Sequence, residues 1–567
     1  MKNFLKKYHF PLICFIYSVL VSLFFTALRI NYAGISKFMG ADSNPSFIVM
    51  NLPIIICVIL WLLSAYSLYG LVVYEKKRIH SKLSLFFSIL FTVAIGVIIY
   101  FGSLDYLYYI VPHFLKSALV FLLLLILGIA LFVPTKNNKK TIGKKVLIMA
   151  GVVLLCVVVG YNLKSNRFTS DGTVYAVEDE YQIVFSTSDN SIAWVEIDGE
   201  KYYDLYAGSM KSKDLVHKIT VPQDRLNRVR EYTIYAQQMI YRGPFGGYKG
   251  DIISVSHEFR PVNTTDGINY YCISDVHDKF NAAYNAAGKI KDLDYLVVLG
   301  DITSMVEYHE NALATTSLAN RITKGEIPVV YARGNHEIKG EYAEDLYKYV
   351  GSKDGNFYYT FSLGRIKGIV LDLGEDHDDD WWEYYETARF DLYRDEQTEL
   401  LKKCLEDEFF KDSEYSMILC HIPIPFVNSR HNHETYKNEW TGIINDLNVD
   451  IVLSGHQHDI TIFEPGLIKP HTELTYNSNF YGEEGKTYKG YLTDFSFYSF
   501  LVGRRANRQT GDTEWLGSSE YTGMHVSVDL KNGKQTVKYT NTANEVVEVC
   551  NMFGKDEPVK EYNIPLR

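Results

Sequence analysis

The stretch VVYARGNHEIKG runs from Val329 to Gly340. It begins as an apolar, β-branched run and stops at a glycine, after which Asn335 and His336 stand side by side. A short apolar run of this kind indicates a buried strand. The amide and the imidazole are therefore predicted to lie where that strand ends, and their meaning depends on whether other strands end in the same way.

Four further apolar runs end in the same kinds of residue. Helix-like segments at 278–292 and 304–323 separate the first three runs, which predicts strand–helix–strand units with largely parallel pairing. Ligands of such sheets bind beyond the carboxyl ends of the strands. All five groups fall there: NYYCISDVHD (269–278) with Asp275 and His277, YLVVLGDITS (295–304) with Gly300 and Asp301, PVVYARGNHE (328–337), YSMILCHIPIP (415–425) with His421, and VDIVLSGHQHD (449–459) with His456 and His458.

The residue types at these five ends fit one chemistry. Asp, His and Asn are ligands for divalent first-row metals. Five of the 16 histidines stand at the predicted strand ends, which is more clustered than surface or core histidines would be. Each motif alone is weak, but five in order, each after a β run, predict a metal site.

Length and composition limit the other interpretations. A chain of 567 residues predicts two or three domains. The formal net charge is -10, so no binding of duplex nucleic acid is expected. The seven cysteines lack C-x-x-C spacing, which supports neither a zinc knuckle nor a disulfide framework.

In these motifs the chain resembles the calcineurin-like metallophosphoesterase superfamily, over about Ile268 to Phe553. The family pattern is D-x-H, G-D-x-x-D, G-N-H-D/E, H and G-H-x-H, and each motif has a counterpart above. The resemblance implies an α/β fold in four layers, αββα. Ser304 stands where the second Asp of G-D-x-x-D is usual. Purple acid phosphatases carry a Tyr ligand there and a glycine in place of His277, so a different metal-site type is expected here.

The resemblance also implies residue roles. Two divalent ions (Mn, Fe, Zn, Co or Ni) are expected, with Asp301 bridging them. A bridging hydroxide is expected to attack a phosphate monoester or diester, and the ligands do not decide between the two. His336 is expected to act as general acid on the leaving oxygen or to stabilise the equatorial charge, and Asn335 and His336 are expected to contact the phosphate. From its place at the strand end, Arg333 either contacts the phosphate as well or lies in a surface pair. The first ion is assigned to Asp275, His277, Asp301 and His458, and the second to Asp301, Asn335, His421 and His456.

Two neighbouring stretches leave alternatives open. GEDHDDDWWEYY, from Gly374 to Tyr385, is either a solvated loop or a rim that selects substrate or holds a cation. His431 and His433 either lie near the cleft that holds the predicted metal site or have no part in that site. A different class of function is also open: a membrane receptor or scaffold with an inactive phosphoesterase domain.

The first third of the chain is interpreted as a five-helix transmembrane region, residues 1–164. Each apolar run is about long enough to cross a bilayer core of roughly 30 Å. Lysines and arginines alternate between the loops, which places the N-terminus in the cytoplasm and the catalytic part outside. An integral membrane protein with lipid as a partner is therefore predicted. The five spans are Phe10–Leu28, Ile54–Val73, Leu83–Phe101, Ser117–Pro134 and Val146–Leu163.

Between these parts, residues 171–262 alternate apolar and polar side chains over strand-like lengths. Asp198-Gly199 between two such runs indicates a hairpin. This segment resembles a fibronectin type III-like module and the β-domain that precedes the catalytic domain of purple acid phosphatases. A β-sandwich spacer is expected, followed by the phosphoesterase domain at 266–567.

Overall fold

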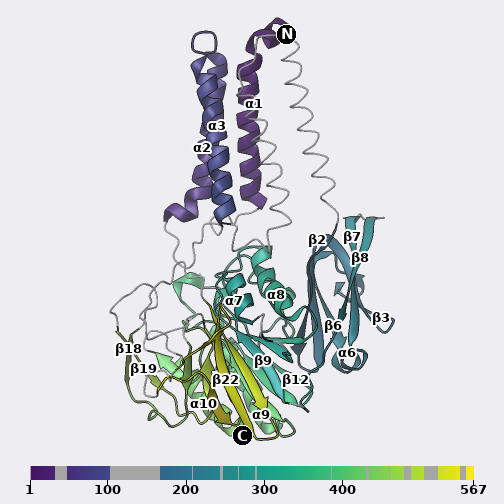
Figure 1. Cartoon of the computed structure of the whole chain (residues 1–567), viewed down its shortest axis with the longest axis vertical. Coiled ribbons are helices and arrows are strands. Elements are labelled where there is room, and N and C mark those ends of the chain that lie inside the picture. The colour runs from purple at the N-terminus through teal and green to yellow at the C-terminus, as the bar shows by residue number, and fades with distance from the viewer. Residues whose placement is uncertain are drawn as a thin grey trace. The chain divides into compact units, whose positions relative to one another are not determined.

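The structure is a computed structural model of the chain (Figure 1). It describes residues 2–31, 47–102 and 166–567, the last with gaps at 207, 243–246, 266, 288–289, 291, 378, 385, 429–432, 459, 478–486, 504–520 and 550–556. The chain divides into two compact units, 1–165 and 166–567.

Three helices make up the described part of the first unit (Figure 1). Apolar side chains such as Tyr17 and Leu60 are buried between them. Hydroxyl groups also lie in this interface: Ser22 Oγ is 2.9 Å from Ser64 Oγ. The helices are α1 (Lys2–Asn31), α2 (Phe47–Val72) and α3 (Ile79–Gly102).

The predicted five-helix transmembrane region is wrong. Within the described ranges, no helix is long and apolar enough to cross a membrane. The predicted localisation as an integral membrane protein, with its cytoplasmic N-terminus and lipid partner, is overturned by the same finding. The last two predicted spans, 117–134 and 146–163, lie outside the described residues.

The second unit contains two large sheets. In the first, three strands run parallel, with Leu296 opposite Val329 and Val297 opposite Cys272. Two helices connect them, as the strand–helix–strand order predicts. The elements are β9 (Ile268–Ile273), α7 (Phe280–Ala287), β10 (Tyr295–Val298), α8 (His309–Thr323) and β11 (Pro328–Tyr331), with the antiparallel β21 (Thr522–Asp529) and β22 (Lys534–Asn541) beside β9.

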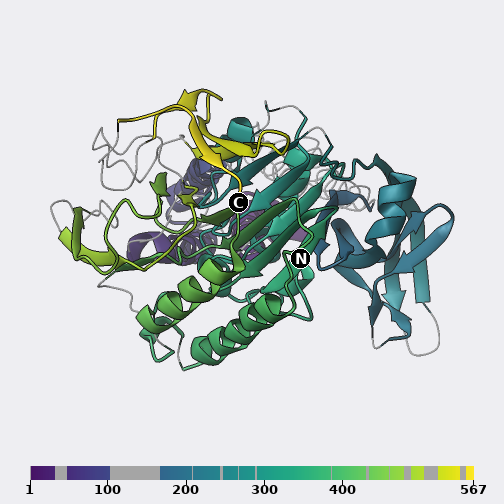
Figure 2. The same ribbon diagram turned by 90° about the horizontal axis from the view of Figure 1, so that it is seen from below.

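The second sheet has the strand order β12-β13-β14-β16-β20-β17, with β13, β14, β16 and β20 parallel. Two helices lie side by side on it (green in Figure 2) and bury Leu401 and Trp440 in its core. The elements are β12 (Tyr359–Leu363), β13 (Ile366–Leu371), α9 (Phe390–Glu406), β14 (Tyr415–Cys420), α10 (Glu434–Leu447), β16 (Ile451–Ser454), β17 (Thr461–Phe463) and β20 (Ser499–Leu501).

Buried tyrosines join the two sheets face to face. The hydroxyl of Tyr270 on β9 lies 2.8 Å from that of Tyr415 on β14. Tyr270 also stacks on Tyr295 of β10, with ring centroids 4.8 Å apart. Large buried aromatic side chains with satisfied hydroxyls fix the distance and the angle between sheets. The predicted α/β phosphoesterase-type architecture is confirmed.

The strands at 168–258 continue the first sheet. Strand β1 pairs in parallel with β11, with Val174 opposite Pro328. The predicted hairpin at Asp198-Gly199 forms, since Ile197 pairs with Glu200 and both turn residues have positive φ. A separate β-sandwich domain at 171–262, and its likeness to a fibronectin module, stay predictions. These strands are β1 (Phe168–Val177), β2 (Glu180–Ile197), β3 (Glu200–Tyr203), β6 (Asp214–Pro222), β7 (Glu231–Arg242) and β8 (Gly247–Glu258), with helix α6 (Gln223–Val229).

Shorter elements complete the described part of this unit. They are β4 (Leu205–Tyr206), β5 (Met210–Lys211), η3 (His336–Ile338), η4 (Leu346–Lys348), η5 (Trp382–Tyr384), β15 (Phe426–Asn428), β18 (Leu474–Asn477), β19 (Thr487–Leu492), β23 (Val546–Val547) and β24 (Tyr562–Pro565).

Candidate metal centre

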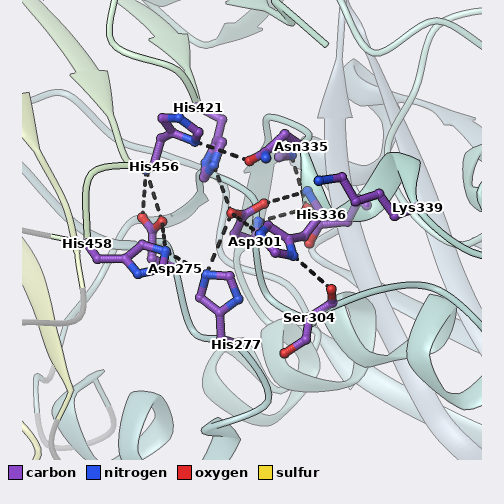
Figure 3. Close-up of polar contacts among 12 residues, drawn as sticks. Asp275, His277, Asp301, Ser304, Asn335, His336, Lys339, His421, His456 and His458 are labelled. Carbon is purple, nitrogen blue, oxygen red and sulfur yellow. Dashed lines mark hydrogen bonds and ion pairs between the residues drawn. The ribbon is translucent and has the colours of Figure 1, made fainter. Parts of the chain in front are cut away.

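Loops from both sheets carry the predicted ligands into one buried cluster (Figure 3). Three loops follow β9, β10 and β11 of the first sheet, and two follow β14 and β16 of the second. The carboxyl ends of these parallel strands therefore meet between the sheets, as the sequence predicts. The side chains brought together are those of Asp275, His277, Asp301, Asn335, His336, His421, His456 and His458.

The backbone of these loops is unusual at the polar residues themselves. A non-glycine residue in the left-handed region is strained by about 1–2 kcal/mol, and such residues persist where the surroundings hold them. Here the strain falls on the residues with metal-ligand side chains, so the loops are shaped for those side chains. The residues are Asp275 (φ 53°), His277 (φ 42°), Asp301 (φ 52°), His456 (φ 70°) and His458 (φ 48°).

Two glycines of the motifs are required by close packing. A Cβ at Gly334 would lie 2.2 Å from Asp301 Oδ1, and a Cβ at Gly455 would lie 2.5 Å from Asp275 Oδ2. Both separations are far below van der Waals contact. The glycines of G-N-H and G-H-x-H therefore allow one loop to approach the carboxylate of another.

The first ligand group contains Asp275, His277, Asp301 and His458. Their ligand atoms all lie within 4.8 Å of one another, and all four side chains are buried. The Nε2 atoms of His277 and His458 face each other at 2.8 Å. His458 Nε2 is 3.3 Å from Asp275 Oδ1, and His277 Nε2 is 3.6 Å from Asp301 Oδ2. This mixed nitrogen and oxygen set suits a first-row divalent metal.

The second ligand group shares Asp301 with the first. It adds His421 and His456, again with ligand atoms within 4.8 Å of one another. His421 Nε2 lies 3.2 Å from Asp301 Oδ2. Asn335 completes the group, because its Oδ1 lies 3.2 Å from His456 Nδ1. The two groups therefore meet at Asp301 Oδ2, which lies 3.6 Å from His277 Nε2 of the first group.

Unsatisfied acceptors test whether this arrangement fits a cation. His421 Nδ1 donates to the carbonyl of Leu299 at 2.5 Å, so the neutral ring presents a lone pair at Nε2. That lone pair faces Asp301 Oδ2, and within the described part of the chain both atoms are buried without a hydrogen bond. Leaving such a group unpaired costs about 1–3 kcal/mol. A cation between the two atoms, either a proton on His421 Nε2 or a metal ion, removes that penalty, so the residues fit a bound metal.

Charge inside the cluster leads to the same conclusion. Burial by itself would lower the pKa of His421, but Asp301 outweighs it and the pKa rises to about 10. Burial would raise the pKa of Asp301, yet His421 and His336 hold it well below the usual range. The cluster thus attracts positive charge at neutral pH, whether as a proton or as a metal ion.

Glu337 ties two of the ligand loops together. Its buried carboxylate accepts hydrogen bonds from the backbone N–H groups of Asp301 (2.8 Å), Ile302 (2.7 Å) and Gly334 (3.1 Å). A carboxylate held by several N–H donors fixes their loops in place. This explains the Glu that follows Asn335 and His336 in the motif.

His336 belongs to neither ligand group. Its backbone N–H donates to Asp301 Oδ1 at 2.9 Å, and its Nδ1 donates to the carbonyl of Ser304 at 2.8 Å. Nε2 lies 3.9 Å from Asp301 Oδ2. Ser304 therefore supports His336 through its carbonyl, where the family pattern has a carboxylate.

Arg333, unlike the other predicted residues, is bound to a side chain outside the cluster. Its Nε and Nη2 atoms bind Asp372 Oδ2 at 2.8 and 2.7 Å, and its guanidinium covers the ring of Phe357. Its predicted contact with substrate phosphate stays a prediction. His433 is buried, with Nε2 3.1 Å from Arg394 Nη2, and His431 lies outside the described residues.

The sequence interpretation missed the part played by Glu375 and Asp376. Both are buried, and they bind Asn335 and His456 respectively. A signal for them was present, because the apolar run IKGIVLDLGED also ends in acidic residues. The start of this loop is therefore not solvated.

Residues 268–459 match the family model described as calcineurin-like phosphoesterase. This part of the chain is a calcineurin-like phosphoesterase domain. The protein is accordingly a metal-dependent phosphoesterase. Proteins of the family that this domain matches use a dimetal centre. Phosphate esters are the substrates that the family implies.

Solved structures show weaker likeness. A purple acid phosphatase from yellow lupin seeds is 12% identical, with a TM-score of 0.45, over 70% of this chain and 75% of that one. GAP50, the anchor in the inner membrane complex of Plasmodium, is 11% identical, with a TM-score of 0.34, over 53% and 90%. A dimetal phosphatase from Danio rerio is 12% identical, with a TM-score of 0.33, over 54% and 100%. TM-scores this low support no inference about function. Among curated proteins, none matches the chain.

Proposed function

We propose that the domain hydrolyses phosphate esters with two divalent ions, one in each ligand group. The observation that carries the proposal is the sharing of Asp301, whose unpaired Oδ2 faces His421 in one group and lies 3.6 Å from His277 in the other. When bound, two such ions clamp a phosphoryl group and lower the pKa of water towards neutrality. The remaining steps fall to the chain's own residues.

Asn335 and His336 are the residues proposed to meet the substrate. Asn335 offers a neutral oxygen, which keeps the centre cationic enough to attract a phosphate. His336 belongs to neither ligand group, and because its Nδ1 donates to the carbonyl of Ser304, the proton available for transfer is the one that Nε2 carries in the imidazolium form. We assign His336 as the general acid that protonates the leaving oxygen. Asp301 accepts from the backbone N–H of His336, and Glu337 accepts from that of Gly334, two residues earlier.

Hydrolysis of two chromogenic esters tests the proposal. The full chain, freed of metal and then supplied with Mn²⁺, is expected to hydrolyse p-nitrophenyl phosphate, bis-p-nitrophenyl phosphate or both. The ratio of the two rates decides between a monoesterase and a diesterase, which the ligands leave open. Chelation is expected to abolish hydrolysis, and added Mn²⁺ to restore it. Hydrolysis of neither ester, by a protein that binds no metal, would refute the proposal.

A further inference from the structure

Glu375 and Asp376 follow β13 and belong to none of the motifs that define the family pattern. Each contacts a different member of the second ligand group. Both are almost completely buried, at 1% and 3% exposure, which is rare for acidic side chains without a purpose-built environment. Their contacts show what they do to the ligands.

Asp376 orients the ring of His456. Asp376 Oδ2 lies 2.9 Å from His456 Nε2, and the opposite ring atom, Nδ1, faces Asn335 Oδ1 at 3.2 Å. An ionised carboxylate only accepts, so Nε2 must carry the proton in this pair. In the neutral ring Nδ1 is then a lone pair directed at the ligand group. A carboxylate that takes one ring N–H sets the tautomer and the basicity of a ligating histidine.

Glu375 orients the amide of Asn335 in the same way. Asn335 Nδ2 donates to Glu375 Oε1 at 3.1 Å and to Oε2 at 3.2 Å. The amide nitrogen is thereby turned away from the ligand group, which leaves Oδ1 to face His456. With the amide reversed, a donor would point at the position of a cation.

Cationic side chains hold the acidic pair in place. Arg394 Nη2 donates to the carbonyl of Glu375 at 2.6 Å, and Lys339 Nζ lies 3.1 Å from Glu375 Oε2. The backbone N–H of Asp376 donates to Glu375 Oε1 at 3.0 Å. Lys437, also buried, places its charge near Asp376. The loop is therefore pre-organised, since each carboxylate is fixed before any ion binds.

These contacts also decide against a third ion. Glu375, Asp376 and His377 have ligand atoms within 4.8 Å of one another. The Glu375 oxygens, however, already accept from Asn335, Tyr384 and Lys339, and Asp376 Oδ2 binds His456. The carboxylates of this loop serve the second ligand group.

We propose that Glu375 and Asp376 are positioning residues that fix Asn335 and His456 as ligands of the second metal ion. The inference rests on the proposed two-metal function. It predicts that the loop controls occupancy of the second position and leaves the first, at Asp275, His277 and His458, unaffected.

Equilibrium dialysis of the metal-free full chain against Mn²⁺ tests this directly. Asp376→Ala is expected to weaken the second binding event by about 10–100-fold, the usual effect of removing such a partner, with the first unchanged. Asp376→Asn keeps an oxygen that accepts from His456 Nε2, so most of the affinity is expected to return. Asp380→Ala, an exposed acid of the same loop, is the matched control and should bind both ions normally.

The outcomes separate the two proposals. Wild-type chain that binds fewer than two ions refutes the two-metal function itself. Only the positioning role is overturned if the wild-type chain binds two ions and Asp376→Ala also binds two at unchanged affinity. The same holds if Asp376→Ala loses both ions equally. If Asp376→Ala fails to fold, Asp376→Asn decides alone: a loss of about fivefold confined to the second ion, as expected for a neutral in place of a charged acceptor, supports the proposal. If Asp376→Asn binds both ions with the affinity of the wild-type chain, the positioning role is overturned.

Discussion

Replacement of His336 by alanine separates proton transfer from metal binding. The side chain makes one hydrogen bond, from Nδ1 to the carbonyl of Ser304, and belongs to neither ligand group. At 22% side-chain exposure it lies where water can reach the freed carbonyl, so the loss of stability should stay near about 1 kcal/mol. Both ions should remain bound.

The expected loss is in the rate. A general acid contributes about 10²–10⁴-fold, which corresponds to about 2.7–5.5 kcal/mol of transition-state stabilisation. That loss applies to alkyl esters, whose leaving oxygen needs a proton. It should shrink for nitrophenyl esters, because nitrophenolate departs unprotonated.

Paired kinetics of an alkyl and a nitrophenyl ester, with bound Mn²⁺ measured in the same samples, provide the assay. His471→Ala is the control, since His471 is exposed and lies in neither ligand group. Equal loss on both esters would make His336 an electrostatic clamp, and loss of metal would make it a ligand. Either result refutes its assignment as the acid.

Two further substitutions have defined outcomes. Asp301→Asn removes charge from the shared ligand and is expected to lose at least one of the two ions, measured as metal per chain; retention of both would show that Asp301 does not bridge. Lys437→Met is expected to make the stability of the metal-free chain less dependent on pH. Burial lowers the pKa of Lys437 to about 8, below the usual value of about 10.4. The folded state holds fewer protons between those values, so wild-type stability rises with pH across the window. In urea unfolding the wild-type chain should therefore gain stability relative to Lys437→Met from pH 7 to pH 10, and a constant difference would contradict the buried-charge explanation.

The predictable part of the centre is the part encoded locally. Each ligand follows directly on an apolar run, so its place at a strand end can be inferred from neighbours in the sequence. The parallel order of β9, β10 and β11 then brings Asp275, Asp301 and Asn335 to one edge. Glycines mark the close approaches, as at Gly334.

What could not be predicted depends on distant contacts. Arg333 is bound by Asp372, 39 residues later, and no spacing rule pairs the two. Asp376 reaches His456 across 80 residues, through loops of irregular backbone. The pairing of β1 with β11 joins segments about 150 residues apart. The alternating pattern alone could therefore not show that the strands at 168–258 extend the first sheet.

Hydropathy was the misleading signal. Long apolar runs predicted five spans, but the pattern does not record whether a helix covers another helix or faces lipid. In the described part of α1 and α2, Ser22 and Ser64 meet inside the helix interface. The composition of the acidic loop did not decide between a solvated loop and a rim of the site, and it could not show that Glu375 and Asp376 are buried.

The central claim is that two ions sharing Asp301 make the active centre. Stepwise addition of Mn²⁺ to the metal-free full chain, with bound metal and ester hydrolysis followed together, tests it most directly. Two ions are expected to bind per chain, and most of the activity is expected to appear when the second ion binds. Full activity at one ion per chain, or binding of two ions without hydrolysis of any phosphate ester, would contradict it.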